Sequence, residues 1–325
     1  MTSDLPQLED VRRAAERVSG IALRTPLVPS AALSAETGRR VLLKLETLQP
    51  IGAFKIRGAA NAVARLPEAV AARGVTCAST GNHGRAVAYA ARRLGLPAIV
   101  CMSRLVPANK VAAIEALGAE ARIGGRSQDE AQQEVDRLVA EEGMAEIPPF
   151  DHPDVVAGQG TIALEMLEDA PALDTLLVPL SGGGLIGGIA LAAKALKPSI
   201  RIVGISMARG AAMHASLAAG RPVAVEEEAS LADSLGGGIG LSNRCTFALV
   251  RDLVDDVVLL DEPQIARGMR WLFEEEGLVV EGGGAVGVSL LLERLAAELG
   301  ETVGVVVSGR NVDRRQFLQA IGYGD

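Results

Sequence analysis

Short runs rich in valine, isoleucine and leucine alternate along the chain with longer stretches rich in alanine and leucine. The short runs lie at 40–46, 74–80, 96–102, 175–181, 200–206, 256–262 and 301–308. This alternation is typical of parallel sheets whose two faces are covered by helices. The sequence therefore predicts an α/β fold with parallel-rich sheets flanked by helices.

The predicted strands fall into two groups along the chain. One group lies between about 56 and 147, and the other begins after "PPFDHPD", in which Pro148, Pro149 and Pro153 interrupt any helix. A stretch of this kind suits a crossing between two lobes. We expect a large domain made of residues 1–55 and 148–325, a small domain of residues 56–147, and a cleft between them.

Charge and composition exclude several classes of partner. The chain has 32 basic and 40 acidic residues and a net charge of -8, which opposes binding to nucleic acid or to anionic lipid. Its three cysteines are far apart and lack the spacing of metal ligands. The amino-terminal stretch is too acidic for a signal peptide, and no apolar run of about 18 residues follows it. We expect a cytoplasmic protein with no nucleic-acid partner and no membrane span.

The first of three glycine-containing turns follows the predicted strand 74–80. It reads "STGNHG", and we expect a helix to start near Gly84. Ligands of doubly wound sheets bind at the carboxyl ends of strands, where the first N–H groups of a helix have no intrahelical partner. The turn can therefore bind an anion. The alternative is a structural helix cap made by its Ser, Thr and Asn residues.

The second turn, "SGGGLIGG", follows the strand 175–181 and opens a helix. Its small residues let the backbone approach a phosphate closely, although tight helix packing is the alternative. The glycines at 182, 184 and 187 also match the dinucleotide pattern G-x-G-x-x-G. That pattern needs an acidic residue about 20 positions onward, and no acid occurs between Asp174 and Glu226. A lone phosphate fits better than a dinucleotide.

The third turn and one lysine complete the set of candidate site residues. Strand 301–308 ends in Ser308, whose hydroxyl can bond a ligand at the strand ends or simply form an ordinary Ser-Gly turn. Lys55 has the apolar neighbours Phe54 and Ile56, whereas most lysines are solvated. Desolvation lowers the pKa of an ammonium group toward the neutral amine that a Schiff base requires.

These parts match the needs of pyridoxal phosphate (PLP): a lysine for its aldehyde, a phosphate anchor, a partner for its ring and a substrate carboxylate site. The motifs "GAFKIRGA", "STGNHG", "VAGQGTIALE", "SGGGLIGG", "VVEGGGAVG" and "SGRNVD" follow one another between Arg24 and Asp313. In these motifs and their order the chain resembles the fold-type-II PLP enzymes of the serine/threonine dehydratase and serine racemase group. This resemblance implies a two-lobed fold like that of the tryptophan synthase β subunit. The stretch "ADSLGGGIGLSNRCTF" is similar to dehydratases of hydroxyectoine utilisation.

The resemblance also assigns roles to residues. It implies that Lys55 forms the Schiff base with PLP and then removes the Cα proton of the substrate. It implies cofactor contacts from Phe54, Lys55, Asn82, Ser181, Gly182, Gly183, Gly184 and Ser308. Phe54 would pack against the ring, Asn82 would bond its 3′-oxygen, and Ser308 would face its nitrogen. It implies a substrate carboxylate site made of Ser79, Thr80, Gly81, Asn82 and His83. Glu281 and Gly236 would support these contacts without touching the ligand themselves. The alternative for Glu281 is a carboxylate that stabilises the start of a helix.

The expected reaction is β-elimination from a small amino-acid substrate. A neutral hydroxyl at Ser308 does not hold the ring nitrogen protonated, so the ring is a weaker electron sink, and elimination lets the charge leave with the β-hydroxyl. The products are a 2-oxo acid and ammonia. One alternative is a racemase, because Thr80 occupies the position where the resembling racemases carry a proton-donating serine. The other is a non-catalytic anion-binding protein, against which Lys55 argues. We expect a homodimer.

Two departures from the family pattern affect metal and substrate. Relatives that bind a divalent cation carry acids where this chain has Ser206 and Ala212, so we predict no metal there. Arg310 replaces a common glycine beside Ser308. A guanidinium there would favour substrates with a second anionic or strongly polar group. The alternative is that Arg310 points away and bonds a neighbouring loop.

Overall fold

Two sheets organise the protein, of which the computed structural model describes residues 5–295 and 298–324. The larger sheet has six strands in the order β1-β2-β10-β7-β8-β9. They are β1 Leu27–Pro29, β2 Arg40–Leu45, β10 Thr302–Val307, β7 Thr175–Pro179, β8 Arg201–Met207 and β9 Asp256–Leu260. Only β1 among these is antiparallel to its neighbour. At the centre of the sheet, Val305 pairs with Leu43 on one side and Leu177 on the other.

The smaller sheet has four parallel strands in the order β5-β4-β3-β6. They are β5 Glu120–Ile123, β4 Ala98–Met102, β3 Val75–Ala78 and β6 Ala145–Glu146. All seven runs predicted from the sequence form strands, so the α/β prediction is confirmed. Strands β1, β5 and β6 were not among the runs predicted from the sequence. These are short, and β5 carries the charged residues Glu120 and Arg122, which form an ion pair instead of an apolar run.

Helices cover both faces of the larger sheet. Alternate strand residues point to opposite faces, so Leu176 and Val306 join one core while Leu177 and Val305 join the other. The helices of the first core are α1 Leu8–Val18, α8 Pro153–Asp169, α9 Gly184–Leu196, α10 Ala212–Ala219 and α11 Thr246–Leu253. Those of the second are α2 Ala31–Thr37, α12 Glu262–Glu276, α13 Gly282–Glu293 and α14 Arg314–Ala320.

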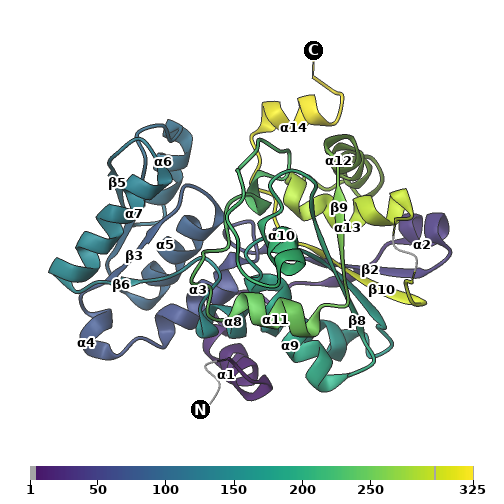
Figure 1. Ribbon diagram of the computed structural model, residues 1–325, viewed down its shortest axis with the longest axis horizontal. Helices are drawn as coiled ribbons and strands as arrows, with labels where there is room; N and C mark the ends of the chain where they lie inside the picture. The colour runs from purple at the N-terminus through teal and green to yellow at the C-terminus, as the bar shows by residue number, and fades with distance from the viewer. Residues whose placement is uncertain (1–4, 296–297, 325) are drawn as a thin grey trace.

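The smaller sheet has its own helices, which lie to the left in Figure 1. They are α4 Glu68–Ala71, α5 Asn82–Leu94, α6 Ala108–Glu115 and α7 Gln128–Arg137. Val100 faces a core shared with α5, whereas Ile99 faces one shared with α7. No helix in the described ranges is long and apolar enough to cross a membrane.

Helix α3 Lys55–Ala64 links the two sheets. It follows the short 3₁₀ turn Glu46–Leu48 and packs against both α5 and α8. Figure 1 shows it between the two halves of the molecule. Eight of its ten residues are buried, and small side chains such as Ala59 and Ala60 allow the close approach of its neighbours. The helix therefore places its first residue, Lys55, where the two halves meet.

Candidate active site

The carboxyl ends of β7 and β10 lie at the edge of the larger sheet that is next to the start of α3. In the large sheet β10 lies beside β7, so Ser308 and the turn that begins at Ser181 share one edge. The turn after β10 is joined to the chain before Lys55, because the N–H of Phe54 donates to the carbonyl of Ser308 at 3.0 Å. The N–H of Arg310 donates to Gly52 at 2.9 Å. These two bonds hold Lys55 beside Ser308.

Lys55 is an amine in a desolvated setting. Its Nζ donates to the carbonyl of Pro149 at 2.8 Å and lies 5.4 Å from the centre of the Phe54 ring. Desolvation by the surrounding protein lowers its pKa from 10.5 to about 8, and the nearby Glu281 carboxylate partly offsets this. The side chain keeps some contact with solvent. A group in this setting is available to react as a neutral amine.

We expect the apoprotein to take up PLP with a pH midpoint near the lowered pKa of Lys55, about 8. Because the pKa of Lys55 is lowered in the folded protein, the fraction of neutral amine rises as the pH passes through that value. Roughly a tenth of the Lys55 side chains are already neutral at pH 7. The rate of appearance of the cofactor's visible absorption, measured from pH 6 to 10, tests this. A rate that rises only above pH 9.5 would show that Lys55 titrates like a solvated lysine.

The glycine turn between β7 and α9 has the shape of a phosphate cradle. Helix α9 begins at Gly184, and Gly183 before it has a φ of +87°, which favours glycine. A Cβ on Gly182 would lie 2.4 Å from the ring of Phe150, and one on Gly183 would lie 2.8 Å from Met213. Backbone N–H groups at this helix start have no intrahelical partner. These residues fit the phosphate of PLP.

Helix α5 starts at Asn82, two residues before the predicted Gly84. The prediction took glycine as the first helical residue, whereas Gly81 is the N-cap, so Asn82 and His83 form the first turn. Ser79 and Thr80 are half-buried before it, and the Ser79 hydroxyl accepts from the N–H of Gly81 at 3.3 Å. The backbone N–H groups in the first turn of α5 have no intrahelical partner, so this helix start is able to bind an anion.

The side chain of His83 is committed elsewhere. Its Nε2 lies 2.7 Å from the carbonyl of Ile147, so Nε2 carries the proton and donates. Burial, with a contribution from Lys55, lowers its pKa to about 3. The imidazole is therefore neutral at physiological pH and adds no positive charge for a carboxylate. Only the backbone N–H of His83 can serve that site.

A buried amide and carboxylate network lies behind the turn. Asn82 Nδ2 donates to both oxygens of Glu281, at 2.9 and 3.2 Å. Asn311 donates to the Asn82 side chain at 2.6 Å, and its backbone N–H donates to Glu281 at 3.0 Å. Burial raises the pKa of Glu281, while the bonds from Asn82 and Ser234 lower it. Glu281 is the N-cap of α13, yet its carboxylate makes no cap bond and faces Asn82 instead.

Gly236 and Arg310 complete the predicted set. Gly236 ends the 3₁₀ turn Asp233–Leu235, and a Cβ there would meet the Asp233 carbonyl at 3.2 Å. This segment packs on the start of α13, because a Cβ on Gly283 would lie 2.3 Å from the Ser234 hydroxyl. Arg310 is exposed, and within residues 5–295 and 298–324 its guanidinium forms no ion pair.

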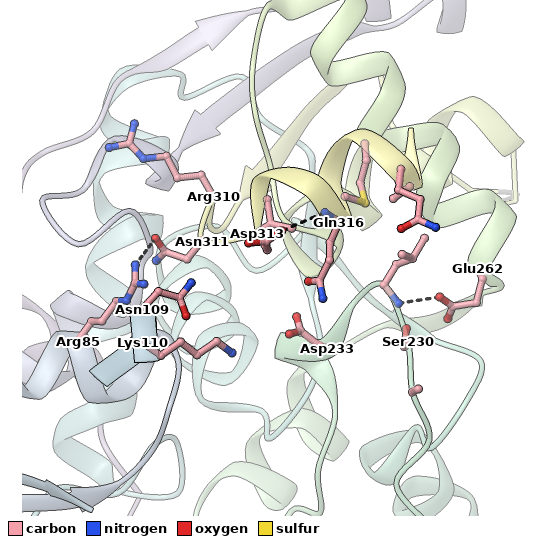
Figure 2. Close-up of a pocket in the computed structure, with 16 residues that line it drawn as sticks. Arg85, Asn109, Lys110, Ser230, Asp233, Glu262, Arg310, Asn311, Asp313 and Gln316 are labelled. Atoms are coloured by element: carbon pink, nitrogen blue, oxygen red, sulfur yellow. Dashed lines mark hydrogen bonds between the residues drawn. The ribbon is translucent and has the colours of Figure 1, made fainter. Parts of the chain in front are cut away.

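A pocket of about 760 Å³ lies beside the network, between α5 and α6 on one side and α14 on the other. Figure 2 shows its cations, Arg85, Lys110 and Arg310, opposite its acids, Asp233, Glu262 and Asp313. Arg85 Nη1 donates to Asn311 Oδ1 at 2.7 Å and so connects the pocket to Asn82. Lys55 and the Ser181–Gly184 turn do not line it. Arg310 extends away from Asp313.

Sequence reasoning missed Phe150 and Asn311. Both lay inside quoted motifs, but their contacts, to Gly182 and to Asn82, join segments far apart in the chain. In the described part of the chain, no group of three or more His, Cys, Asp or Glu residues could hold a metal ion. The predicted absence of a metal at Ser206 and Ala212 stays a prediction.

Comparison with known proteins matches this arrangement. Residues 18–309 match the family model described as "Pyridoxal-phosphate dependent enzyme". A Sinorhizobium fredii protein named provisionally as a threonine dehydratase is 56% identical over 306 residues, covering 94% of this chain and 92% of its own. An L-threo-3-hydroxyaspartate ammonia-lyase of a Pseudomonas species is 39% identical over 98% of this chain and 99% of its own. The structure of maize serine racemase is 36% identical, covers 98% of this chain and 97% of its own, and superposes with a TM-score of 0.91. The chain therefore belongs to the family of pyridoxal-phosphate dependent enzymes, with the fold of its type-II members.

Proposed function

We propose that the chain is an ammonia-lyase that uses PLP to eliminate the β-hydroxyl of a hydroxy amino acid. The observation that carries the proposal is the amine of Lys55, with a pKa lowered to about 8, held beside the Ser308 turn. When bound, PLP withdraws electrons from the substrate Cα and so makes its proton removable. Lys55 would accept that proton, and the β-hydroxyl would take up a proton and leave as water when the β-carbon–oxygen bond breaks. The released enamine would then react with one water to give a 2-oxo acid and ammonia.

The surrounding residues bind and orient the cofactor. The N–H groups of the Ser181–Gly184 turn would hold its phosphate at the start of α9. Phe54, the residue before α3, would pack against its ring, and Asn82 would donate to its 3′-oxygen by giving up one of its two bonds to Glu281. Ser308 would offer the ring nitrogen a neutral hydroxyl. Glu281, whose carboxylate accepts both bonds from Asn82, fixes the orientation of that amide, and Gly236 lies in the segment packed on α13.

The substrate carboxylate site is the turn before α5. Its positive character comes from unpaired backbone N–H groups at the helix start, since the His83 ring is neutral. Ser79 and Thr80 place hydroxyl groups, and Gly81 an unobstructed backbone, at the same turn. A Cβ on Gly81 would meet nothing within 4 Å. The turn therefore leaves space for a ligand.

We also propose the domain division that the sequence predicts, and the segments that supply each sheet support it. Strands of the larger sheet come from 27–45 and 175–307, and those of the smaller sheet from 75–146. We assign 1–55 and 148–325 to the large domain and 56–147 to the small one, with α3 crossing between them. The homodimer and the cytoplasmic location stay predictions.

A substrate with a second carboxylate is the class we favour within this reaction. The Pseudomonas relative is named for L-threo-3-hydroxyaspartate, and Arg310 places an exposed guanidinium on the turn that carries Ser308. Bidentate pairing of arginine with a carboxylate gives both energy and geometry. The finer assignment, to a substrate derived from hydroxyectoine, rests on the sequence of the 232–247 stretch.

The direct test is a screen of serine, threonine, 3-hydroxyaspartate and hydroxyectoine-derived amino acids for 2-oxo acid release by the purified holoenzyme. We expect 2-oxo acid and ammonia in equal amounts from at least one of them. A protein that binds PLP but releases no 2-oxo acid from any would contradict the proposal and favour a non-catalytic anion-binding protein.

Arg310→Gly should lower the preference for 3-hydroxyaspartate over serine and threonine. The expected change in the ratio of kcat/KM values is roughly 10- to 100-fold, because a charge-assisted hydrogen bond contributes about 1.5–3 kcal/mol. The measurement is kcat/KM for the three substrates in wild type and variant, with exposed Arg104→Gly as a control for lost surface charge. An unchanged ranking would show that Arg310 bonds elsewhere.

Racemisation is the second candidate, favoured by the similarity to maize serine racemase. Thr80 carries the hydroxyl that would protonate the opposite face of Cα, and in the described part of the chain this hydroxyl makes no hydrogen bond. Its methyl group restricts χ1, however. We expect Thr80→Ser to raise the ratio of D-serine to pyruvate formed from L-serine, and Thr80→Ala to lower it. Wild-type enzyme that makes more D-serine than pyruvate would overturn the lyase assignment.

A further inference from the structure

Four charged side chains form a buried cluster beneath the first turn of α3. Lys44 lies on β2, Glu46 directly after it, Arg57 on α3 and Glu165 on α8. The first three are at most 1% exposed and Glu165 is 13% exposed. The two positive and two negative charges balance. Hereafter these four residues are called the ion quartet.

Arg57 is the centre of the ion quartet. Its Nε and Nη2 donate to the two oxygens of Glu46, both at 2.8 Å. Its Nη1 and Nη2 donate to the two oxygens of Glu165, at 2.6 and 2.8 Å. Further bonds reach the hydroxyl of Thr161 at 3.0 Å and the carbonyl of Leu23 at 3.1 Å. The guanidinium fork thus ties α3 to the amino-terminal segment, β2 and α8 at once.

The start of α3 lacks the capping interactions that usually hold the first turn of a helix. Phe54 is its N-cap residue and provides no side-chain cap bond, and the first turn has no acidic residue. Lys55 is the first helical residue, and Arg57 lies two residues later in the same turn. The backbone bond from Phe54 to Ser308 holds one side of this turn. The Arg57 side chain holds the other.

A buried ion cluster of this kind is better able to fix the position of the helix turn than to stabilise the fold. Removing charges from water costs so much that apolar replacements of similar size are often equally stable or more stable. A guanidinium fork, in contrast, accepts only one arrangement of its carboxylates. Every donor direction of Arg57 is used, so a shift of the turn would break several bonds together.

We propose that Arg57 is a positioning residue for Lys55, fixing the first turn of α3 so that the lysine amine stays in reach of the substrate Cα. This inference rests on the proposed role of Lys55. A purely structural role for the ion quartet would lower stability without a selective effect on turnover. The two roles therefore differ in what they change besides the melting temperature.

The test compares the holoenzyme variants Arg57→Lys and Asp174→Ala. Arg57→Lys keeps the charge but loses the fork. Asp174 accepts from the N–H groups of Glu301 and Thr302, at 2.8 and 3.1 Å, at the amino ends of β7 and β10. Its loss should weaken the fold at the end of the sheet opposite the site. Melting temperature, kcat, KM and the pH midpoint of the cofactor's visible absorption band are measured for each.

We expect Arg57→Lys to lower kcat roughly 10- to 100-fold, the effect of a small misplacement of a reacting group, with KM within about twofold and a shifted pH midpoint. Asp174→Ala should lower the melting temperature with kcat and midpoint unchanged. If Arg57→Lys does not fold, Glu46→Gln, which keeps the shape of the partner, replaces it with the same expectation. Equal behaviour of the two variants at matched loss of melting temperature would overturn the positioning role.

The two proposals fail in different ways. Lys55→Ala that keeps both the absorption band and activity would defeat the proposed function. The role of Arg57 alone would be defeated by a different pair of results. In that case Lys55→Ala loses both the absorption band and activity, while Arg57→Lys has the kcat and pH midpoint of wild type.

Discussion

Lys55→Ala is expected to reduce 2-oxo acid formation below detection while the protein stays folded. Losing a positioned proton-transfer group typically costs ~10²–10⁴ in rate, and the variant also loses the amine that bonds to PLP. The fold should persist because the Lys55 side chain makes one hydrogen bond, to Pro149, and contributes no apolar core contact on which the helix depends. The measurements are turnover, visible absorption and melting temperature.

The matched control for Lys55→Ala is Lys194→Ala. Lys194 lies near the carboxyl end of α9 and pairs with Asp255 at 2.7 Å. The Lys194→Ala variant loses a lysine, as Lys55→Ala does, and in addition an ion pair. About 15 Å of helix separates Lys194 from the glycine turn. Its activity should equal that of wild type. Dehydratase activity retained by purified Lys55→Ala protein would defeat the assignment of this site.

The fold could be predicted from the sequence because the central strands of both sheets are largely buried. Runs such as 175–179 and 302–307 are rich in valine and leucine and carry no charged residue, since both faces of the larger sheet are covered. The short strands at the edges lack this signal. Strand β1 ends in Pro29 and β6 has two residues, so local pattern gives little information about either.

The candidate site could be predicted in part. The glycine turns and Lys55 are local features, each readable from a few neighbouring residues. The network that joins Asn82, Glu281 and Asn311 brings together residues about 200 positions apart, and no pairing rule in the sequence specifies it. The neutral state of His83 likewise depends on Ile147, which approaches only in the folded chain.

The ion quartet shows the same limit in another form. From the sequence alone, Lys44, Glu46 and Glu165 are expected to be ordinary surface charges, because such residues are rarely buried unless paired. Their pairing with Arg57 depends on α8 packing across α3, a contact between segments about 100 residues apart. In our proposal, the position of the Lys55 amine therefore depends on residues whose pairing arises only in the tertiary structure.

Gly183→Ala should weaken PLP binding roughly 10- to 100-fold, since each 1.4 kcal/mol is a factor of ten. Alanine at the observed φ of +87° is strained by about 1–2 kcal/mol. Its Cβ would also lie 2.8 Å from Met213 and 2.9 Å from Thr246, and overpacking typically costs about 1–3 kcal/mol. The turn can relieve both only by moving the N–H groups that, in our proposal, hold the phosphate. Equilibrium binding of PLP to the apoprotein measures this.

Gly187→Ala is the matched control, because it changes a second glycine of the same "SGGGLIGG" stretch. Gly187 lies within α9, and a Cβ there would meet Leu249 at 3.4 Å, an ordinary contact. Replacing a helical glycine by alanine is favourable by roughly 0.5–1 kcal/mol, so this variant should bind PLP like wild type and melt no lower. If both variants bound the cofactor equally well, the phosphate would have to be held outside the Ser181–Gly184 turn. Weakened binding in Gly183→Ala alone would instead place the phosphate at the start of α9, where the backbone conformation requires glycine.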